Sequence, residues 1–144
     1  AFERIFTSVF TPHEPMIAAL KRLHGHGVAL IAASNIERMC HDRLKLMGIH
    51  ELFRAHCLSY EVGAVKPEQA FYMAAHQVLE RAYAGFLPDL YEEHTAVLFI
   101  DDNPGNVAAA LNSGTVTHGC VYDMRDHPAF ERFLEGFEVG PPRA

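Results

Sequence analysis

Two short runs of apolar residues constrain the fold of this chain more than any other feature of its sequence. They are VALIAAS at 28–34 and AVLFID at 96–101. A continuous apolar run of this length is typical of a strand that is buried on both faces, as in the middle of a parallel sheet. We therefore expect both strands to lie in the interior of a sheet and not at its edges.

Helical patterns separate these strands along the chain. Apolar residues recur at helical spacing in segments 15–27, 36–48, 67–84, 104–114 and 127–137, and shorter strand-like segments lie at 55–60 and 115–122. Alternating helices and buried strands predict right-handed crossovers and a parallel sheet covered on both faces. The expected fold is therefore α/β, a three-layer, doubly wound parallel sheet, and 144 residues are enough for one such domain.

Polar residues follow the predicted strands where each one ends. Ser34 and Asn35 follow the first apolar run, Lys66 follows the strand-like segment at 55–60, and the last residue of the second run, Asp101, is followed at once by Asp102. Ligands of such sheets bind beyond the carboxyl ends of the strands, so these side chains are expected at one rim.

Each of these groups also has an ordinary structural interpretation. Ser34 and Asn35 could cap a helix, and Lys66 could be a solvated side chain before a helix. Two adjacent carboxylates at the end of a buried strand are harder to explain without a cation, and oxygen ligands favour Mg²⁺. Asn106 lies one turn into the following helix and can reach back to the same point. Together the residues suggest a phosphate held by Mg²⁺, Lys66 and Ser34, but they include no nucleophile.

Three segments in this order resemble the haloacid dehalogenase (HAD) superfamily, in its phosphatase-like branch. LIAASN resembles its Ser/Thr motif, GAVKPEQAF its lysine motif and FIDDNPGNVAAALNSG its acidic motif, within residues 12–122. The resemblance implies that Ser34, Asn35 and Lys66 bind phosphate, and that Lys66 is the catalytic residue that holds phosphate and nucleophile together. It also implies that Asp102 binds Mg²⁺ with Asp101 in support, whereas Asn106 contacts the metal through water or not at all.

The chain departs from that family at its N-terminus. The family's nucleophile lies in a DxDx[TV] motif, and no such motif occurs here. Phe2, Ile5, Phe6, Val9 and Phe10 have helical spacing, so residues 1–11 are expected to be the tail of a helical cap. Residues 12–144 are then an incomplete HAD-like core that lacks its first central strand. In that case the two apolar strands should not pair with each other, because the missing strand separates them.

The resemblance implies a Mg²⁺-dependent phosphohydrolase of small phosphate esters that forms an aspartyl-phosphate. The nucleophile would lie outside this chain, and the 144 residues alone would be inactive. A truncated, non-catalytic binding module fits the missing nucleophile directly. A dehalogenase is a further alternative, although it would leave the acidic pair without a role, and the order of the motifs is the reverse of that in a receiver domain.

The composition of the chain limits the classes of partner that it is expected to bind. The formal net charge is −6 and no basic run occurs, which argues against nucleic acid or an anionic membrane as partner. The partner that the resemblance implies is a small phosphorylated metabolite, and the sequence indicates no oligomeric state.

Three widely spaced cysteines favour reduced thiols in a cytoplasmic protein. His24 and His26 are close together, but a glycine-rich turn explains them better than a metal site. The polar segment 85–95 could be a surface excursion or a partner contact.

Overall fold

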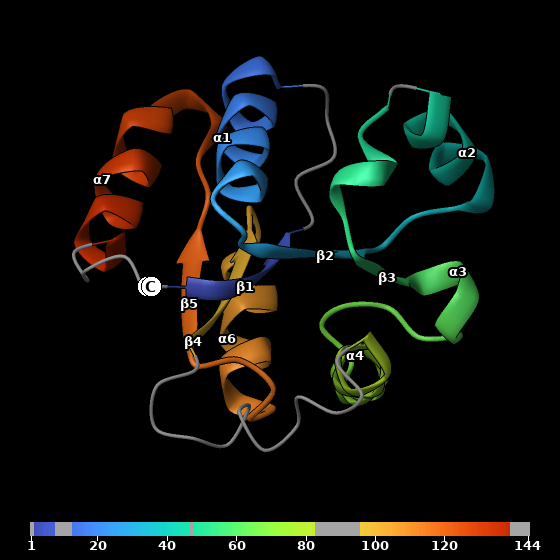
Figure 1. Ribbon diagram of the computed structural model, residues 1–144. Helices are drawn as coiled ribbons and strands as arrows, with labels where there is room; N and C mark the ends of the chain where they lie inside the picture. The colour runs from blue at the N-terminus through green and yellow to red at the C-terminus, as the bar shows by residue number, and fades with distance from the viewer. Residues whose placement is uncertain (1, 8–12, 47, 83–95, 139–144) are drawn as a thin grey trace.

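The strands form one parallel sheet with the N-terminal strand at its centre (Figure 1). The computed structural model describes residues 2–7, 13–46, 48–82 and 96–138, and within them the sheet has five strands in the order β3-β2-β1-β4-β5. Every adjacent pair is parallel. The strands are β1 (Phe2–Thr7), β2 (Ala29–Ser34), β3 (Ala55–Leu58), β4 (Ala96–Asp101) and β5 (His118–Val121). This is the doubly wound α/β sheet that the sequence predicts.

Helices cover both faces of the sheet. The longer ones are α1 (Glu14–Gly25), α2 (Arg38–Leu46), α4 (Gln69–Ala82), α6 (Pro104–Asn112) and α7 (His127–Glu138). Helices α1 and α7 lie on one face, and α4 and α6 lie on the other (Figure 1). The shorter turns are η1 (His50–Leu52), α3 (Ser59–Val62) and η2 (Met124–Asp126).

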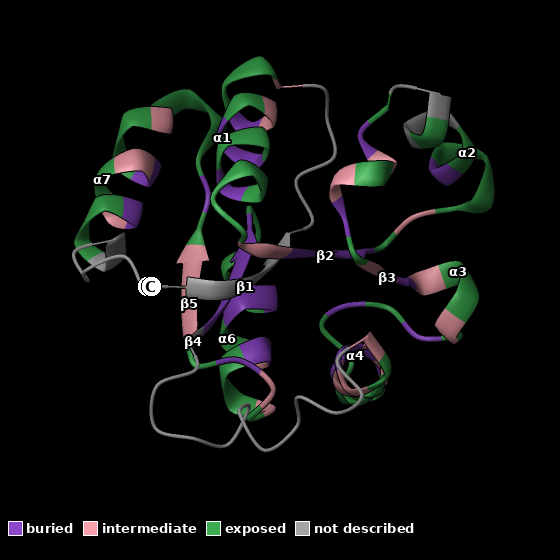
Figure 2. Ribbon diagram, in the orientation of Figure 1, coloured by how far each residue is buried: buried purple, intermediate pink, exposed green. Residues whose placement is uncertain are grey.

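The interior strands are apolar throughout because each of their faces meets a separate core. In β2, Leu30 and Ala32 pack with α1 and α7, whereas Ile31 and Ala33 pack with α4 and α6. Strand β4 alternates in the same way, and both strands are almost wholly buried (Figure 2). The expectation that these two runs are interior strands is confirmed.

The N-terminal segment differs from its expected structure. Residues 2–7 form strand β1 and not a helical cap, and β1 pairs with β2 on one side and with β4 on the other. As expected, β2 and β4 do not pair with each other, but the place between them is filled by this chain's own strand. The expectation of an absent central strand is therefore wrong. Apolar residues at this spacing over so few positions are compatible with a strand or a helix. Hydrogen bonding to β2 on one side and β4 on the other stabilises the strand.

Smaller differences concern the middle of the chain. Ser59 and Tyr60 belong to the turn α3 and not to a strand, and α4 begins at Gln69, two residues after the expected Pro67. The expected surface or partner segment 85–95 lies outside the described residues. Among the helices that the structure describes, none combines the length and the apolarity that crossing a bilayer requires.

Candidate functional site

A polar cavity of about 540 Å³ opens at the carboxyl ends of β2 and β4. It lies where the strand order reverses around β1, which is where doubly wound sheets bind ligands. The structure brings together here all six residues expected from the sequence and adds Asn103 and Pro104. The lining residues are Ser34, Asn35, Lys66, Asp101, Asp102, Asn103, Pro104 and Asn106.

Lys66 and Asp101 form a buried ion pair at the base of this cavity. Lys66 Nζ donates to Asp101 Oδ2 at 2.6 Å and to the carbonyl oxygen of Ala33 at 3.0 Å. The two residues are only 6% and 1% exposed. Burial lowers the pKa of Lys66, and the charge of Asp101 opposes that shift. An ammonium has three N–H donors, so the third remains for a ligand in the cavity.

Asp101 is held almost entirely by donors of the protein. Its Oδ1 accepts from the backbone N–H of Asn103 at 2.8 Å, and its Oδ2 accepts from Asn106 Nδ2 at 3.2 Å as well as from Lys66. Four lone-pair sites shared among three donors leave little coordination capacity for a metal. Asp101 therefore orients Lys66 and Asn106, and its expected support of a metal beside Asp102 stays a prediction.

Asp102 is the exposed carboxylate of the acidic pair. A hydrogen bond with Asp101 raises the pKa of Asp102, and partial burial and the charge of Asp101 act in the same direction. A cation bound between the two carboxylates would oppose this shift, because it stabilises their ionised forms. The carboxylate of Asp102 and the amide oxygen of Asn106 are hard oxygen donors, so the residues present fit Mg²⁺.

Asn35 fixes the backbone from which Lys66 projects. Its Oδ1 accepts from the backbone N–H of Lys66 at 2.7 Å, and its Nδ2 donates to the carbonyl oxygen of Lys66 at 3.0 Å. This two-point contact joins the end of β2 to the segment that follows α3. The geometry makes Asn35 a positioning residue for Lys66, and its direct contact with phosphate stays a prediction.

The start of α6 supplies features that we did not predict as part of the site. Asn103 caps this helix by accepting from the backbone N–H of Gly105 at 2.8 Å, and Pro104 occupies the first turn. Tyr72 of α4 donates from its hydroxyl to the carbonyl oxygen of Asn106 at 2.8 Å. This hydrogen bond joins α6 to α4, the other helix on the same face of the sheet. The Asn-Pro pair is an ordinary helix-start signal, and it could have marked a positive helix end at this rim.

Charge decides what the cavity can bind. Lys66 contributes one positive charge and the acidic pair two negative charges, so the three side chains sum to about −1 when all are ionised. A phosphate is repelled by that excess unless a divalent cation joins it, and a bound Mg²⁺ brings the sum to about +1. The arrangement can therefore bind a cation alone, or a cation together with an anion.

Comparisons with known proteins agree on the fold. No family model matches the sequence, and no curated protein matches it. The fold is similar to that of an uncharacterized protein from Corynebacterium glutamicum ATCC 13032, with a TM-score of 0.66 and 18% identity over 97% of this chain and 98% of that chain. It is also similar to a HAD-superfamily hydrolase from Ehrlichia chaffeensis, with a TM-score of 0.56 and 15% identity over 90% of this chain and 63% of that chain. The chain has a HAD-like α/β fold.

Proposed function

We propose that this chain carries the Mg²⁺- and phosphate-binding part of a phosphohydrolase that acts on small phosphate esters. The observation that carries the proposal is the convergence of Lys66, Asp101 and Asp102 in one polar cavity at the point where the strand order reverses. The HAD-like fold supports a hydrolase, and the charge balance of the cavity supports joint binding of a cation and an anion.

Different side chains would bind the Mg²⁺ ion and the phosphate oxygens. Asp102 would hold Mg²⁺ with Asn106 nearby, and Mg²⁺ when bound supplies positive charge to the phosphate oxygens. Lys66 donates its remaining N–H to another phosphate oxygen, and the hydroxyl of Ser34 is available from the end of β2. Because Lys66 is anchored by Asp101 and Ala33, its ammonium is preorganised for the charge that develops during phosphoryl transfer.

The nucleophile in this proposal is an aspartate that lies beyond the given sequence. Segment 2–12 contains no aspartate, although β1 holds the central place from which such a residue would reach the cavity. A strand that brings an aspartate to the cavity must therefore take the place of β1. The covalent step is attack of that carboxylate on phosphorus with loss of the alcohol, followed by hydrolysis of the aspartyl-phosphate by water.

A non-catalytic binding module is the second candidate. It is favoured by β1 itself, since this strand occupies the centre of the sheet and contains no aspartate. In this case the cavity binds Mg²⁺ and a phosphorylated metabolite but does not cleave the ester.

Hydrolysis of p-nitrophenyl phosphate with Mg²⁺ separates the two candidates. We expect no turnover by the 144-residue chain, and turnover by a protein extended at its N-terminus by a strand that carries the aspartate. In the extended protein, Lys66→Met should lower kcat by at least about 100-fold, because it removes a preorganised charge at the phosphate. Asp123→Asn, at an exposed ion pair with Arg125, should leave kcat unchanged.

Two results would contradict the proposal in different ways. Turnover by the 144-residue chain that Lys66→Met abolishes would place the nucleophile within this sequence. An extended protein that carries the aspartate, binds Mg²⁺ and still has no turnover would leave the binding module as the function.

A further inference from the structure

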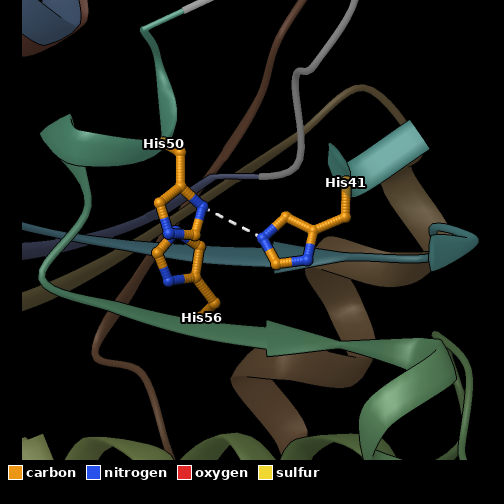
Figure 3. Close-up of side chains that lie close together, drawn as sticks. All are labelled: His41, His50 and His56. Carbon is orange, nitrogen blue, oxygen red and sulfur yellow. Dashed lines mark hydrogen bonds between the residues drawn. The ribbon is translucent and has the colours of Figure 1, made fainter. Parts of the chain in front are cut away.

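Three histidine rings meet between α2, η1 and β3, apart from the polar cavity at the rim (Figure 3). They belong to His41 of α2, His50 of η1 and His56 of β3. One ring nitrogen from each residue lies within 4.8 Å of those of the other two. None of the three lines the cavity that holds Lys66 and the acidic pair, so this histidine cluster is a separate site.

The rings are already in close contact. His41 Nε2 and His50 Nδ1 are joined by a hydrogen bond of 3.0 Å. The rings of His50 and His56 stack with centroids 4.0 Å apart and planes within 9° of parallel. Two ligand nitrogens of a tetrahedral zinc ion are about 3.3 Å apart, given Zn–N bonds of about 2.0–2.1 Å, so the His41–His50 separation is close to that of a ligand pair.

The surroundings of the cluster are apolar and narrow. Its other lining residues are Ala32, Ile49, Phe53 and Leu58, and the cavity that they enclose with the histidines is about 10 Å³. A space of this size holds one ion or about one water molecule and excludes an organic ligand. His41 is only 5% exposed, so its ring is largely removed from solvent.

One nitrogen of the cluster has no partner of its own. His56 Nε2 is buried and makes no hydrogen bond within the described part of the chain. A buried polar atom without a partner costs free energy, and in a native protein it calls for a ligand or an ion. On the outer side, His41 Nδ1 lies 2.7 Å from the hydroxyl of Tyr60, the kind of contact that orients a metal-binding imidazole.

Burial keeps two of the rings, those of His41 and His56, in the neutral form that binds a metal. Burial lowers the pKa of His41, and it lowers the pKa of His56 to about 4. Lys45 acts in the same direction on both rings, whereas Glu61 and Asp42 partly oppose it at His41. A neutral imidazole has a lone pair for a metal, so protons compete only weakly with a metal at His41 and His56 near neutral pH.

We propose that His41, His50 and His56 bind one Zn²⁺-type transition-metal ion and thereby join α2, η1 and β3. Three imidazole nitrogens suit Zn²⁺ and its neighbours in the first transition row and do not suit Mg²⁺, which prefers oxygen. A metal lies in the plane of each ring that binds it, so one of the two stacked rings must turn about its χ2 bond when the ion binds. That torsion has a broad energy well. The site is independent of the rim cavity and of the function proposed for it.

Calorimetric titration of zinc chloride into the full chain tests this site. The titration is carried out in buffer with excess Mg²⁺ on the wild type and on Asp102→Asn, so that Zn²⁺ binding at the rim carboxylates is distinguished from binding at the histidines. We expect one equivalent to bind, and His50→Ala/His56→Ala to weaken the affinity by at least about 100-fold. The matched control is His24→Ala/His26→Ala, which also removes two histidines but from the exposed C-terminal end of α1, and it should bind as the wild type does.

A measurement on the wild type covers the case in which the double variant does not fold. With nitrogen-15 histidine labelling, the first equivalent of Zn²⁺ should shift ring signals of three of the ten histidines. His41→Gln, His50→Gln and His56→Gln assign these signals one at a time. Absence of binding, equal loss of affinity in the control variant, or shifts confined to other histidines would each overturn the proposal.

Discussion

Lys66 and Asp101 form the contact on which both the site and the local stability depend. Both side chains are removed from water, and desolvation of each charge is offset only while the other remains in place. The carbonyl of Ala33, the backbone N–H of Asn103 and the amide of Asn106 form further hydrogen bonds with the pair. A residue placed for phosphate chemistry is thus also a partner in a buried network, so its replacement must be judged by stability as well as by activity.

Replacement of either member of this pair should be costly, and replacement of both should be less costly than the sum. We expect Lys66→Met to lower the free energy of unfolding by about 3–5 kcal/mol, because it leaves Asp101 buried without its cation. In the double variant Lys66→Met/Asp101→Asn the two losses should fall short of additivity by about 1–3 kcal/mol. Urea denaturation in the presence of a chelator measures all three variants. Strictly additive losses would mean that the two charges are not coupled.

Cys57 offers a test of core packing at a single residue. Its thiol is fully buried, and burial raises the pKa of Cys57 to about 12. The native state therefore keeps this proton where an unfolded thiol, with a pKa of about 8.5, has lost it. Between those two pH values the native state binds more protons than the unfolded state, so the contribution of Cys57 to stability decreases as pH rises.

In native buffer at about pH 8, a disulfide reagent should therefore modify the exposed Cys40 quickly and Cys57 only after unfolding. The reaction of Cys57 in a Cys40→Ser variant should accelerate with urea as the unfolded population grows. If Cys57 reacted in native buffer as fast as Cys40 does in the wild type, the burial of the Cys57 side chain in β3 would be contradicted.

At the scale of elements, β5 and α6 approach each other through a glycine. A Cβ placed on Gly119 of β5 would lie 2.5 Å from Val107 Cγ1 and 3.2 Å from Leu111 Cδ1, both on α6. Valine is stiff about χ1 and cannot move aside as a long side chain can. Because α6 starts with the residues that line the cavity, this close packing also sets where the site's helix lies.

Gly119→Ala should lower the free energy of unfolding by about 1–3 kcal/mol through overpacking. The matched control is Gly136→Ala in α7, where nothing lies within 4 Å of the added Cβ. That change should raise stability by up to about 1 kcal/mol, because alanine is the better helix former. Thermal unfolding followed by circular dichroism compares the two. A loss of stability in both variants, or in neither, would contradict the packing of β5 against α6.

Elements also show where sequence patterns suffice and where they fail. Strands β2 and β4 were predictable because two cores require apolar residues at every position. Strand β1 was not predictable, because Phe2, Ile5 and Phe6 fit a helical period equally well and only its two neighbours determine its structure.

The site residues were predictable from their places at strand ends, but the contact that each side chain makes was not. Nothing in the sequence indicates that Asn35 holds the backbone of Lys66, or that Asp101 accepts hydrogen bonds from three protein donors. The histidine cluster was equally hidden. Positions 41, 50 and 56 share no periodic spacing, and only the packing of α2, η1 and β3 brings their rings together.

For the whole molecule, topology explains why chemistry gathers at one rim. From β1 in the middle of the sheet, the chain winds outward through β2 and β3, and it returns across β1 to add β4 and β5. The two directions of winding separate at β1, and the residues beyond the strand ends on either side of it face a common cavity. The cavity carries a net negative charge in an acidic protein, so anion binding there depends on a cation.

The central claim is that this cavity binds Mg²⁺ and phosphate together, and calorimetric titration of inorganic phosphate with and without Mg²⁺ tests it most directly. Binding linkage requires that Mg²⁺ and phosphate strengthen each other by the same factor. We predict that Mg²⁺ tightens phosphate binding by at least about tenfold in the wild type and in Asp123→Asn, and that Asp102→Asn abolishes the gain. Phosphate affinity that is equal with and without Mg²⁺, or a gain that Asp102→Asn retains in full, would contradict the account.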